Sequence, residues 1–315
     1  MYCPSHHFGK LNNFLLKHNK RLRQPDMNSL VQKILSCVGA IAIWWCGSQG
    51  AIAGALSDRI DRYPNWDRQP FVRQHEGELT YPEWFRGRWV ATSTLIEQIA
   101  PLAPEIVTPG FESNRQYINK PIYFTVQFIP TDPTKALKFS PLNLPRLKSS
   151  LPAPQIVADR AFNGLNIAIA YLGAANVQSV TIDPQNPTKQ ITRLTQDRQL
   201  EAFVTGFDSD SQRLLQRETL NPNRFISTEV SQQVFRTSST IYLNTVETTT
   251  SYQFSSTPTP TITATQISAI YLSPQDPDYL RSLSTFGSPV ALYKYRLDLV
   301  PAIGQSPRFA NDLPQ

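Results

Sequence analysis

Two acidic residues, Asp159 and Glu247, are the best candidates for acid–base chemistry in this sequence, because each stands among apolar or threonine-rich neighbours. A pair of carboxyl groups is sufficient to hydrolyse a glycosidic bond. Both residues also fit structural roles. Asp159, beside Arg160, suits a helix cap or an ion pair, and Glu247 suits a pairing with an arginine across two strands. Buried carboxylates are usually paired, so we favour the structural roles and keep a carboxylate-dependent hydrolase as an alternative.

Sulfur and imidazole chemistry is nearly absent after residue 55. All three cysteines and three of the four histidines precede that position, which leaves His75 in a polar stretch. A chain cleaved near residue 55 has no thiol nucleophile, no disulfide and no cysteine-based metal site. The sequence also contains no nucleophile elbow, phosphate-binding loop, dinucleotide fingerprint or calcium loop. We therefore predict no cofactor and no metal, and we favour a non-catalytic protein.

The N-terminal region carries the features of an export signal. Residues 34–46 form an apolar run of 13 residues behind Lys33, and this run is shorter than the roughly 20 needed to span a membrane. Small residues follow, and both Ala51-Ile52-Ala53 and Ala53-Gly54-Ala55 suit a signal peptidase. We predict a cleavable export segment within residues 1–55. An uncleaved membrane anchor is the alternative, because no charge occurs between residues 34 and 57.

The net charge of +6 belongs mostly to this leader. Six of the 30 basic residues and one of the 24 acidic residues lie within residues 1–55, so the remaining chain carries +1. Residues 1–26 form a polar, basic arm, and translation could start at Met1 or at Met27. The mature part has no basic stripe with interleaved aromatic residues, so we do not expect it to bind nucleic acid.

The mature chain divides into an arm over residues 56–80, one domain over 81–301 and a disordered tail over 302–315. The arm is expected to be extended and to lie over the domain. Within the domain, apolar and polar residues alternate along nine segments, which predicts half-buried strands. These segments are 89–99, 121–129, 177–182, 190–195, 199–207, 225–235, 240–254, 261–271 and 290–299. Residues 157–173 are predicted to form one short helix that begins near Asp159 and ends at Gly173. A strand with Leu165, Ile167, Ile169 and Tyr171 on one face is the alternative.

The start of the first strand, Gly87-Arg88-Trp89, resembles the G-x-W signature of lipocalin-like barrels. Asp-Pro and Asn-Pro turns between several strands favour an antiparallel sheet, and strands of this length favour a closed barrel. We therefore predict a mainly β fold, a single antiparallel lipocalin-like β-barrel. The resemblance implies that Trp89 closes one end and that a basic residue of the last strand, Lys294 or Arg296, packs across it. A tryptophan that fills a sandwich core is the alternative.

A second resemblance covers most of residues 81–301. The segments that carry it are 81–89, 157–173, 246–252, 271–277 and 289–299. They are similar to an uncharacterised family of exported proteins found in cyanobacteria and plastids. The resemblance implies a location in the thylakoid lumen or the periplasm, and it implies no reaction.

The expected function is to bind a small apolar or amphipathic molecule inside the barrel. The predicted lining is Trp89, Phe124, Phe128, Tyr271 and Tyr293. Hydroxyl groups on an apolar wall would come from the tyrosines Tyr123, Tyr242, Tyr252, Tyr271, Tyr293 and Tyr295. Structural roles are assigned to Gly87, Arg160, Glu247 and Arg296. If aromatic side chains fill the interior, a scaffold for photosynthetic membrane complexes becomes the alternative function.

Overall fold

The structure is a computed structural model that describes residues 53–70, 72–74, 78–132, 153–210, 221–283 and 287–302. The predicted export segment before residue 53, His75 and the tail after residue 302 lie outside these residues. In the described part of the chain, no helix is long and apolar enough to cross a membrane.

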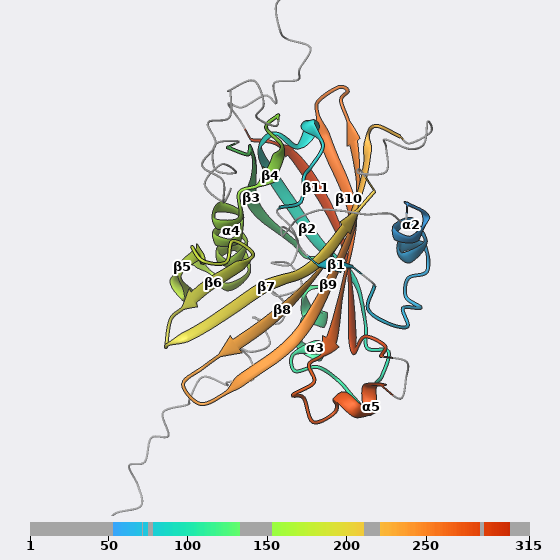
Figure 1. Cartoon of the computed structure of the whole chain (residues 1–315), viewed down its shortest axis with the longest axis vertical. Coiled ribbons are helices and arrows are strands. Elements are labelled where there is room, and N and C mark those ends of the chain that lie inside the picture. The colour runs from blue at the N-terminus through green and yellow to red at the C-terminus, as the bar shows by residue number, and fades with distance from the viewer. Residues whose placement is uncertain are drawn as a thin grey trace, which may run out of the picture.

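The described strands form one curled antiparallel sheet, shown in Figure 1. Ten strands follow each other in the order β4-β3-β2-β11-β10-β9-β8-β7-β6-β5, and β1 pairs with β7 beside this path. The strands are β1 (Arg73–Gln74), β2 (Gly87–Ile99), β3 (Pro121–Pro130), β4 (Ile156–Ala158), β5 (Val177–Ile182), β6 (Lys189–Leu194), β7 (Arg198–Ser209), β8 (Arg224–Arg236), β9 (Ile241–Ser255), β10 (Thr261–Leu272) and β11 (Ala291–Pro301). All nine predicted strands are confirmed, and β1 and β4 are additional short strands.

The sheet is an open half-barrel, so the prediction of a closed barrel was wrong. The strand with Trp89 does pair with the last strand, since Trp89 lies opposite Pro301. The opposite ends of the sheet, β4 and β5, do not pair with each other. The predicted helix, α4 (Arg160–Leu172), packs against β3 on one side and against β5 and β6 on the other. Closure fails because α4 occupies the place where the two edges would meet.

A buried asparagine of α4 takes over the hydrogen bonds of the β3 edge. Asn163 Oδ1 accepts from the backbone N–H of Gln127 at 2.7 Å, and Asn163 Nδ2 donates to the Gln127 carbonyl at 3.0 Å. The N–H of Asp159 donates to the same carbonyl, and the Asp159 carboxylate caps the helix at the N–H of Phe162. One side chain thus satisfies an edge peptide that has no strand partner at this position.

We expect Asn163→Ala to lower the free energy of unfolding by about 1–3 kcal/mol, because it leaves the buried N–H of Gln127 without its acceptor. Asn166→Ala is the matched control on the same helix. Asn166 donates to the carbonyl of Phe162 within its own helix, so its loss should be nearly neutral. Urea denaturation followed by circular dichroism measures both values. Equal effects of the two substitutions would contradict this role of Asn163.

Besides α4, several short helices of the described residues lie around the sheet. An α-helix, α2 (Ala53–Asp61), precedes the sheet, so the predicted arm is not wholly extended. The others are α3 (Phe111–Asn114), α5 (Tyr279–Leu283) and the 3-10 helix η2 (Glu83–Phe85). Two further 3-10 helices, η3 (Arg115–Tyr117) and η6 (Ala174–Asn176), follow α3 and α4. Figure 1 shows α2 outside the sheet near β9 and β10, and α3 and α5 at one end.

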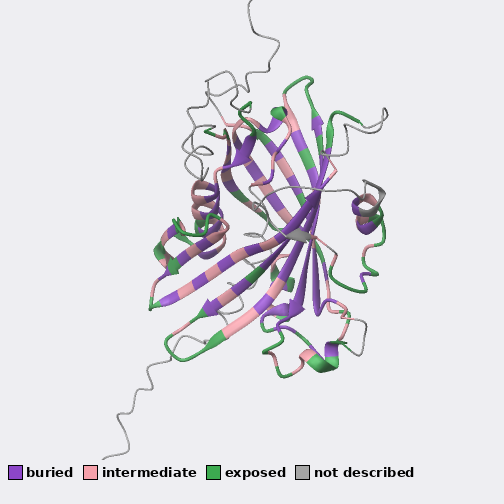
Figure 2. Ribbon diagram, in the orientation of Figure 1, coloured by how far each residue is buried: buried purple, intermediate pink, exposed green. Residues whose placement is uncertain are grey.

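The two faces of the sheet are buried by different partners. The concave face carries the main hydrophobic core, whose rings at one end include Tyr81, Phe85 and Phe128 at centroid distances of 4.7 to 4.9 Å. The convex face of β10 and β11 carries a smaller cluster that Trp66 of the arm covers. In Figure 2 buried residues therefore form long stretches along β9 and β10, where residues 246–250 and 266–272 are all buried.

The G-x-W segment is partly as expected. Gly87 has φ +108, a backbone conformation that side chains with a Cβ rarely adopt. Trp89 is fully buried and donates from Nε1 to the carbonyl of Phe85 at 2.8 Å. The expected basic residue across Trp89 is not found. Arg296 is exposed and pairs with Asp298 at 2.9 Å, and Lys294 lies over the ring of Tyr63, because both point to the convex face.

Candidate functional site

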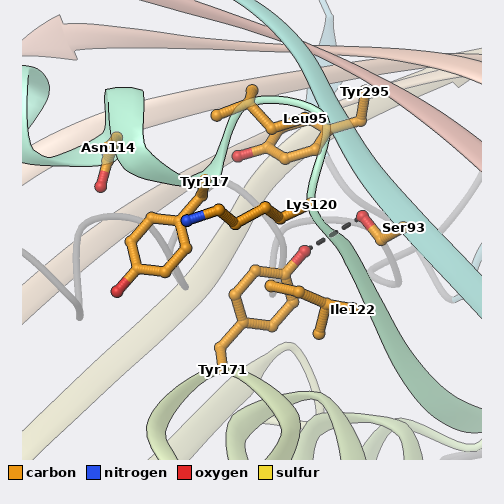
Figure 3. Close-up of a pocket in the computed structure, with 8 residues that line it drawn as sticks. All are labelled: Ser93, Leu95, Asn114, Tyr117, Lys120, Ile122, Tyr171 and Tyr295. Atoms are coloured by element: carbon orange, nitrogen blue, oxygen red, sulfur yellow. Dashed lines mark hydrogen bonds between the residues drawn. The ribbon is translucent and has the colours of Figure 1, made fainter.

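A pocket opens on the concave side between β2, β3, β11, η3 and α4. The centre of a water-sized sphere can move through about 30 Å³ of this pocket, and the wider space between the lining side chains, open solvent at the mouth included, is about 440 Å³. Two apolar side chains, Leu95 and Ile122, contribute to the lining. The other described lining residues all carry a polar group: Ser93, Asn114, Tyr117, Lys120, Tyr171 and Tyr295. Figure 3 shows the Lys120 side chain lying among the three tyrosine rings. The pocket thus combines apolar walls with several hydrogen-bonding groups.

The alternation of the strands places three of these residues. Ser93 and Leu95 lie on the face of β2 that also buries Trp89 and Ala91. Tyr295 of β11 lies opposite Leu95 in the ladder, next to a register shift that leaves Ile96 without a partner. Such a bulge bends a strand and re-aims the side chains beside it. The bulge therefore helps to turn Leu95 and Tyr295 toward the pocket.

The segment after η3 is held against the bulge. The N–H of Asn119 donates to the carbonyl of Leu95 at 2.8 Å, and Ile118 forms an isolated bridge with Leu95. Asn119 has φ 61, a left-handed conformation that asparagine tolerates better than most residues. These contacts fix the segment from Tyr117 to Lys120, so both side chains reach the mouth of the pocket.

Helix α4 supplies the opposite wall. The hydroxyl of Tyr171 donates to Ser93 Oγ at 3.0 Å, as the dashed line in Figure 3 shows. The Tyr171 ring also lies 6.3 Å from the ring of Phe124, centroid to centroid. Because Ser93 Oγ accepts a hydrogen bond from Tyr171, the Ser93 hydroxyl can donate its own hydrogen bond to another acceptor. The helix that prevents closure of the sheet therefore also completes the pocket.

The charge at the pocket is positive. Among the lining residues that the structure describes, Lys120 alone is charged, and none is a carboxylate. Lys120 is exposed and forms none of the ion pairs found between described residues. Deeper in, Asn114 Nδ2 donates to the Tyr293 hydroxyl at 3.2 Å. Burial raises the pKa of Tyr293 to about 12, so its phenol is neutral at physiological pH.

The concave face next to the pocket is polar as well. Tyr295 lies opposite Gln266, and Gln266 lies opposite Thr250 on the next strand. One step further along the strands, Ser268, Thr248 and the buried carboxylate Glu229 lie opposite one another in turn. Glu229 was not among the site residues predicted from the sequence. A polar strip therefore crosses the interior that was predicted to be lined by aromatic rings.

Four of the five predicted lining residues belong to the main hydrophobic core on the concave face, and Tyr271 does not. Trp89 and Phe128 are packed in the core, and Phe128 is enclosed by other rings. Phe124 and Tyr293 lie directly behind the pocket, in contact with Tyr171 and Asn114. Tyr271 lies on the convex face, under the arm. No member of this set is among the described residues that line the pocket.

The two candidate carboxylates have structural contacts. Asp159 is the N-cap of α4, which is one of the roles expected for it. Glu247 is fully buried on the convex face, where it pairs with Arg59 of α2 rather than with an arginine on a strand. Arg160, which begins α4, is buried and donates to the carbonyl of Pro187 at 2.6 Å, and it pairs with Glu78 at 3.6 Å. Neither Asp159 nor Glu247 lines the pocket.

The pairing between Arg59 and Glu247 is part of a larger network. Arg59 Nη2 donates to Glu247 Oε2 at 2.6 Å, and the Tyr271 hydroxyl donates to the same oxygen at 2.9 Å. The guanidinium of Arg59 lies 4.0 Å from the ring centroid of Trp66. Burial alone would lower the pKa of Arg59, but the hydrogen bond and charge of Glu247 raise it above the usual value. Burial and the charge of Glu247 raise the pKa of Tyr271 well above its usual value.

Sequence reasoning found some pocket residues and missed others. Ser93 and Leu95 lie in the strand predicted over residues 89–99, and Tyr295 was among the tyrosines proposed for a cavity. Tyr117 and Lys120 were missed, because they lie between proline-rich segments without a periodic pattern. Their approach to β2 depends on the bulge and on the Asn119 contact. In the described part of the chain, no group of three or more metal-ligating side chains occurs.

Comparison with known proteins places the chain in a family. The chain belongs to the family described as a domain of unknown function (DUF6816), which matches residues 74–302. The match covers the sheet from β2 to β11, and it includes α4 and all described residues of the pocket. It does not assign the chain to the lipocalins. No curated protein and no solved structure matches the chain.

Proposed function

We propose that this DUF6816 protein binds a small amphipathic molecule in the pocket between the concave sheet face and α4. The observation that carries the proposal is the composition of the lining: Leu95 and Ile122 offer apolar contact, while tyrosine, serine, asparagine and lysine groups surround them. Small-molecule sites are typically concave, with apolar walls and a few placed polar groups. The contacts of Asp159 and Glu247 favour a binding protein over the carboxylate-dependent hydrolase.

The proposed setting is outside the cytoplasm. The apolar run 34–46, the basic residue before it and the small residues after it support export to the thylakoid lumen or the periplasm. An accessory role at a photosynthetic membrane complex rests on the resemblance to exported cyanobacterial and plastid proteins. This scaffold function becomes the better proposal if the pocket binds nothing, because Trp89 and Phe128 already fill one end of the interior.

Titration with Nile red, an uncharged dye whose emission depends on its surroundings, tests the pocket. We expect saturable binding, with the dye excited directly. Ile122→Trp should weaken binding at least tenfold, because the larger ring fills the space next to Ser93. Tyr123→Trp is the matched control, since the neighbouring side chain points to the opposite, exposed face. Absence of saturable binding, or equal binding by Ile122→Trp and the wild type, would rule the proposal out.

A further inference from the structure

We propose that the ligand of this pocket is an anion: a small molecule with an apolar body and a negatively charged head that Lys120 holds at the mouth. This inference rests on the proposed binding function and names the class of ligand. It follows from the distribution of charge and hydrogen-bond donors over the lining, and from the placement of the apolar side chains.

The charge of the described lining is one-sided. Lys120 contributes a positive charge, and none of the described lining residues contributes a negative one. Two carboxylates that lie close in sequence to lining residues do not compensate it. Glu97, two residues after Leu95, lies opposite Lys294 on the convex face, and Glu112, two residues before Asn114, pairs with Arg115 at 2.6 Å. Arg115 thus has a carboxylate partner, whereas Lys120 is in none of the ion pairs found between described residues. An anionic group would supply the missing counter-charge.

The hydrogen-bonding groups near Lys120 also suit an acceptor. A lysine ammonium offers three donors and no acceptor, and a tyrosine hydroxyl such as that of Tyr117 can donate a hydrogen bond. Ser93 Oγ already accepts a hydrogen bond from Tyr171, so the Ser93 hydroxyl can donate a hydrogen bond to the ligand. A carboxylate or similar oxyanion accepts such bonds and offers no proton in return, so it fits this set better than a cation.

The arrangement orients the ligand. Lys120 is exposed at the mouth, whereas Leu95 is buried and Ile122 is partly buried. Figure 3 shows the ammonium group near the ring of Tyr117 and away from Ile122. We expect the charged head at the mouth, beside the exposed Lys120, and the apolar body against Leu95, Ile122 and the ring of Tyr171.

Displacement of Nile red by two competitors with the same chain tests the inference. Dodecanoate carries the anionic head and 1-dodecanol carries a neutral one. Wild-type protein should bind dodecanoate at least tenfold more tightly than 1-dodecanol, and higher salt should reduce this ratio. Lys120→Gln should remove most of the preference without affecting 1-dodecanol. Because Lys120 is exposed, this change should not disturb folding.

Arg115→Gln is the matched control, since it removes one positive charge from η3 at a residue that does not line the pocket. It should leave the preference intact. If both competitors displace the dye equally from the wild type, the anionic class is wrong while the pocket still binds. If Lys120→Gln keeps the preference as Arg115→Gln does, Lys120 does not hold the head of the ligand and the inference is overturned. If Nile red itself does not bind, the proposed function and this inference both fall.

Discussion

Arg59→Ala is expected to lower the free energy of unfolding by about 3–5 kcal/mol, because it leaves the carboxylate of Glu247 buried without its counter-charge. The guanidinium also stacks on Trp66 and donates to the carbonyl of Arg68, so its loss weakens the attachment of the arm. Chemical denaturation followed by circular dichroism gives the value. A secondary prediction is higher sensitivity of the arm to proteolysis.

Two variants make this experiment specific. Arg62→Ala lies one turn further along, at an exposed side chain, and should change stability by less than about 0.5 kcal/mol. The double variant Arg59→Met with Glu247→Leu removes both charges and keeps apolar volume, so it should recover most of the lost stability. If Arg59→Ala were as stable as Arg62→Ala, the arm would not be held by this ion pair.

Trp89→Ala should also cost about 3–5 kcal/mol, through the cavity left by a fully buried indole. The side chain belongs to the main hydrophobic core and donates to the carbonyl of Phe85. Trp89→Phe should cost less, since it keeps a ring in the core and loses the hydrogen bond. Thermal and chemical denaturation of both variants measure these differences.

The matched control is Tyr123→Ala, an aromatic side chain on the neighbouring strand that is 63 % exposed. Its removal should change stability by less than about 0.5 kcal/mol. The comparison between Trp89→Ala and Tyr123→Ala shows how much more stability an aromatic side chain contributes on the buried face of the sheet than on the exposed face. A Trp89→Ala variant as stable as Tyr123→Ala would show that Trp89 has no structural role at this end of the sheet.

The extent of the strands could be predicted from the sequence with good agreement. Residues 177–182 were predicted as a strand and form β5 over the same residues. The helix over 157–173 was also identified, with Asp159 as its cap and Gly173 after its last residue. These features depend on neighbours within a few positions, such as alternation, caps and prolines, so they can be read along the chain.

The orientation of buried residues could not be predicted where both faces of a strand are covered. On β10 the residues from Gln266 to Leu272 are all buried, because the core covers one face and the arm covers the other. Alternation then no longer distinguishes the faces. For this reason Tyr271 was assigned to the interior, although it lies on the convex face beside Glu247.

Closure of the sheet and the identity of the site depend on contacts between distant segments. Asn163 and Gln127 form hydrogen bonds although they are 36 positions apart in the sequence, and Arg59 and Glu247 form theirs although they are 188 positions apart. The sequence by itself determined the strands, the helix and the chemistry that is missing after residue 55, because these follow from local pattern and composition. The tertiary structure decided that α4 keeps the sheet open, that Lys120 reaches the same pocket as Tyr171 and Tyr295, and that Glu247 is paired. Such contacts between distant residues depend on how whole helices and strands pack, and a pattern of neighbouring residues does not contain that information.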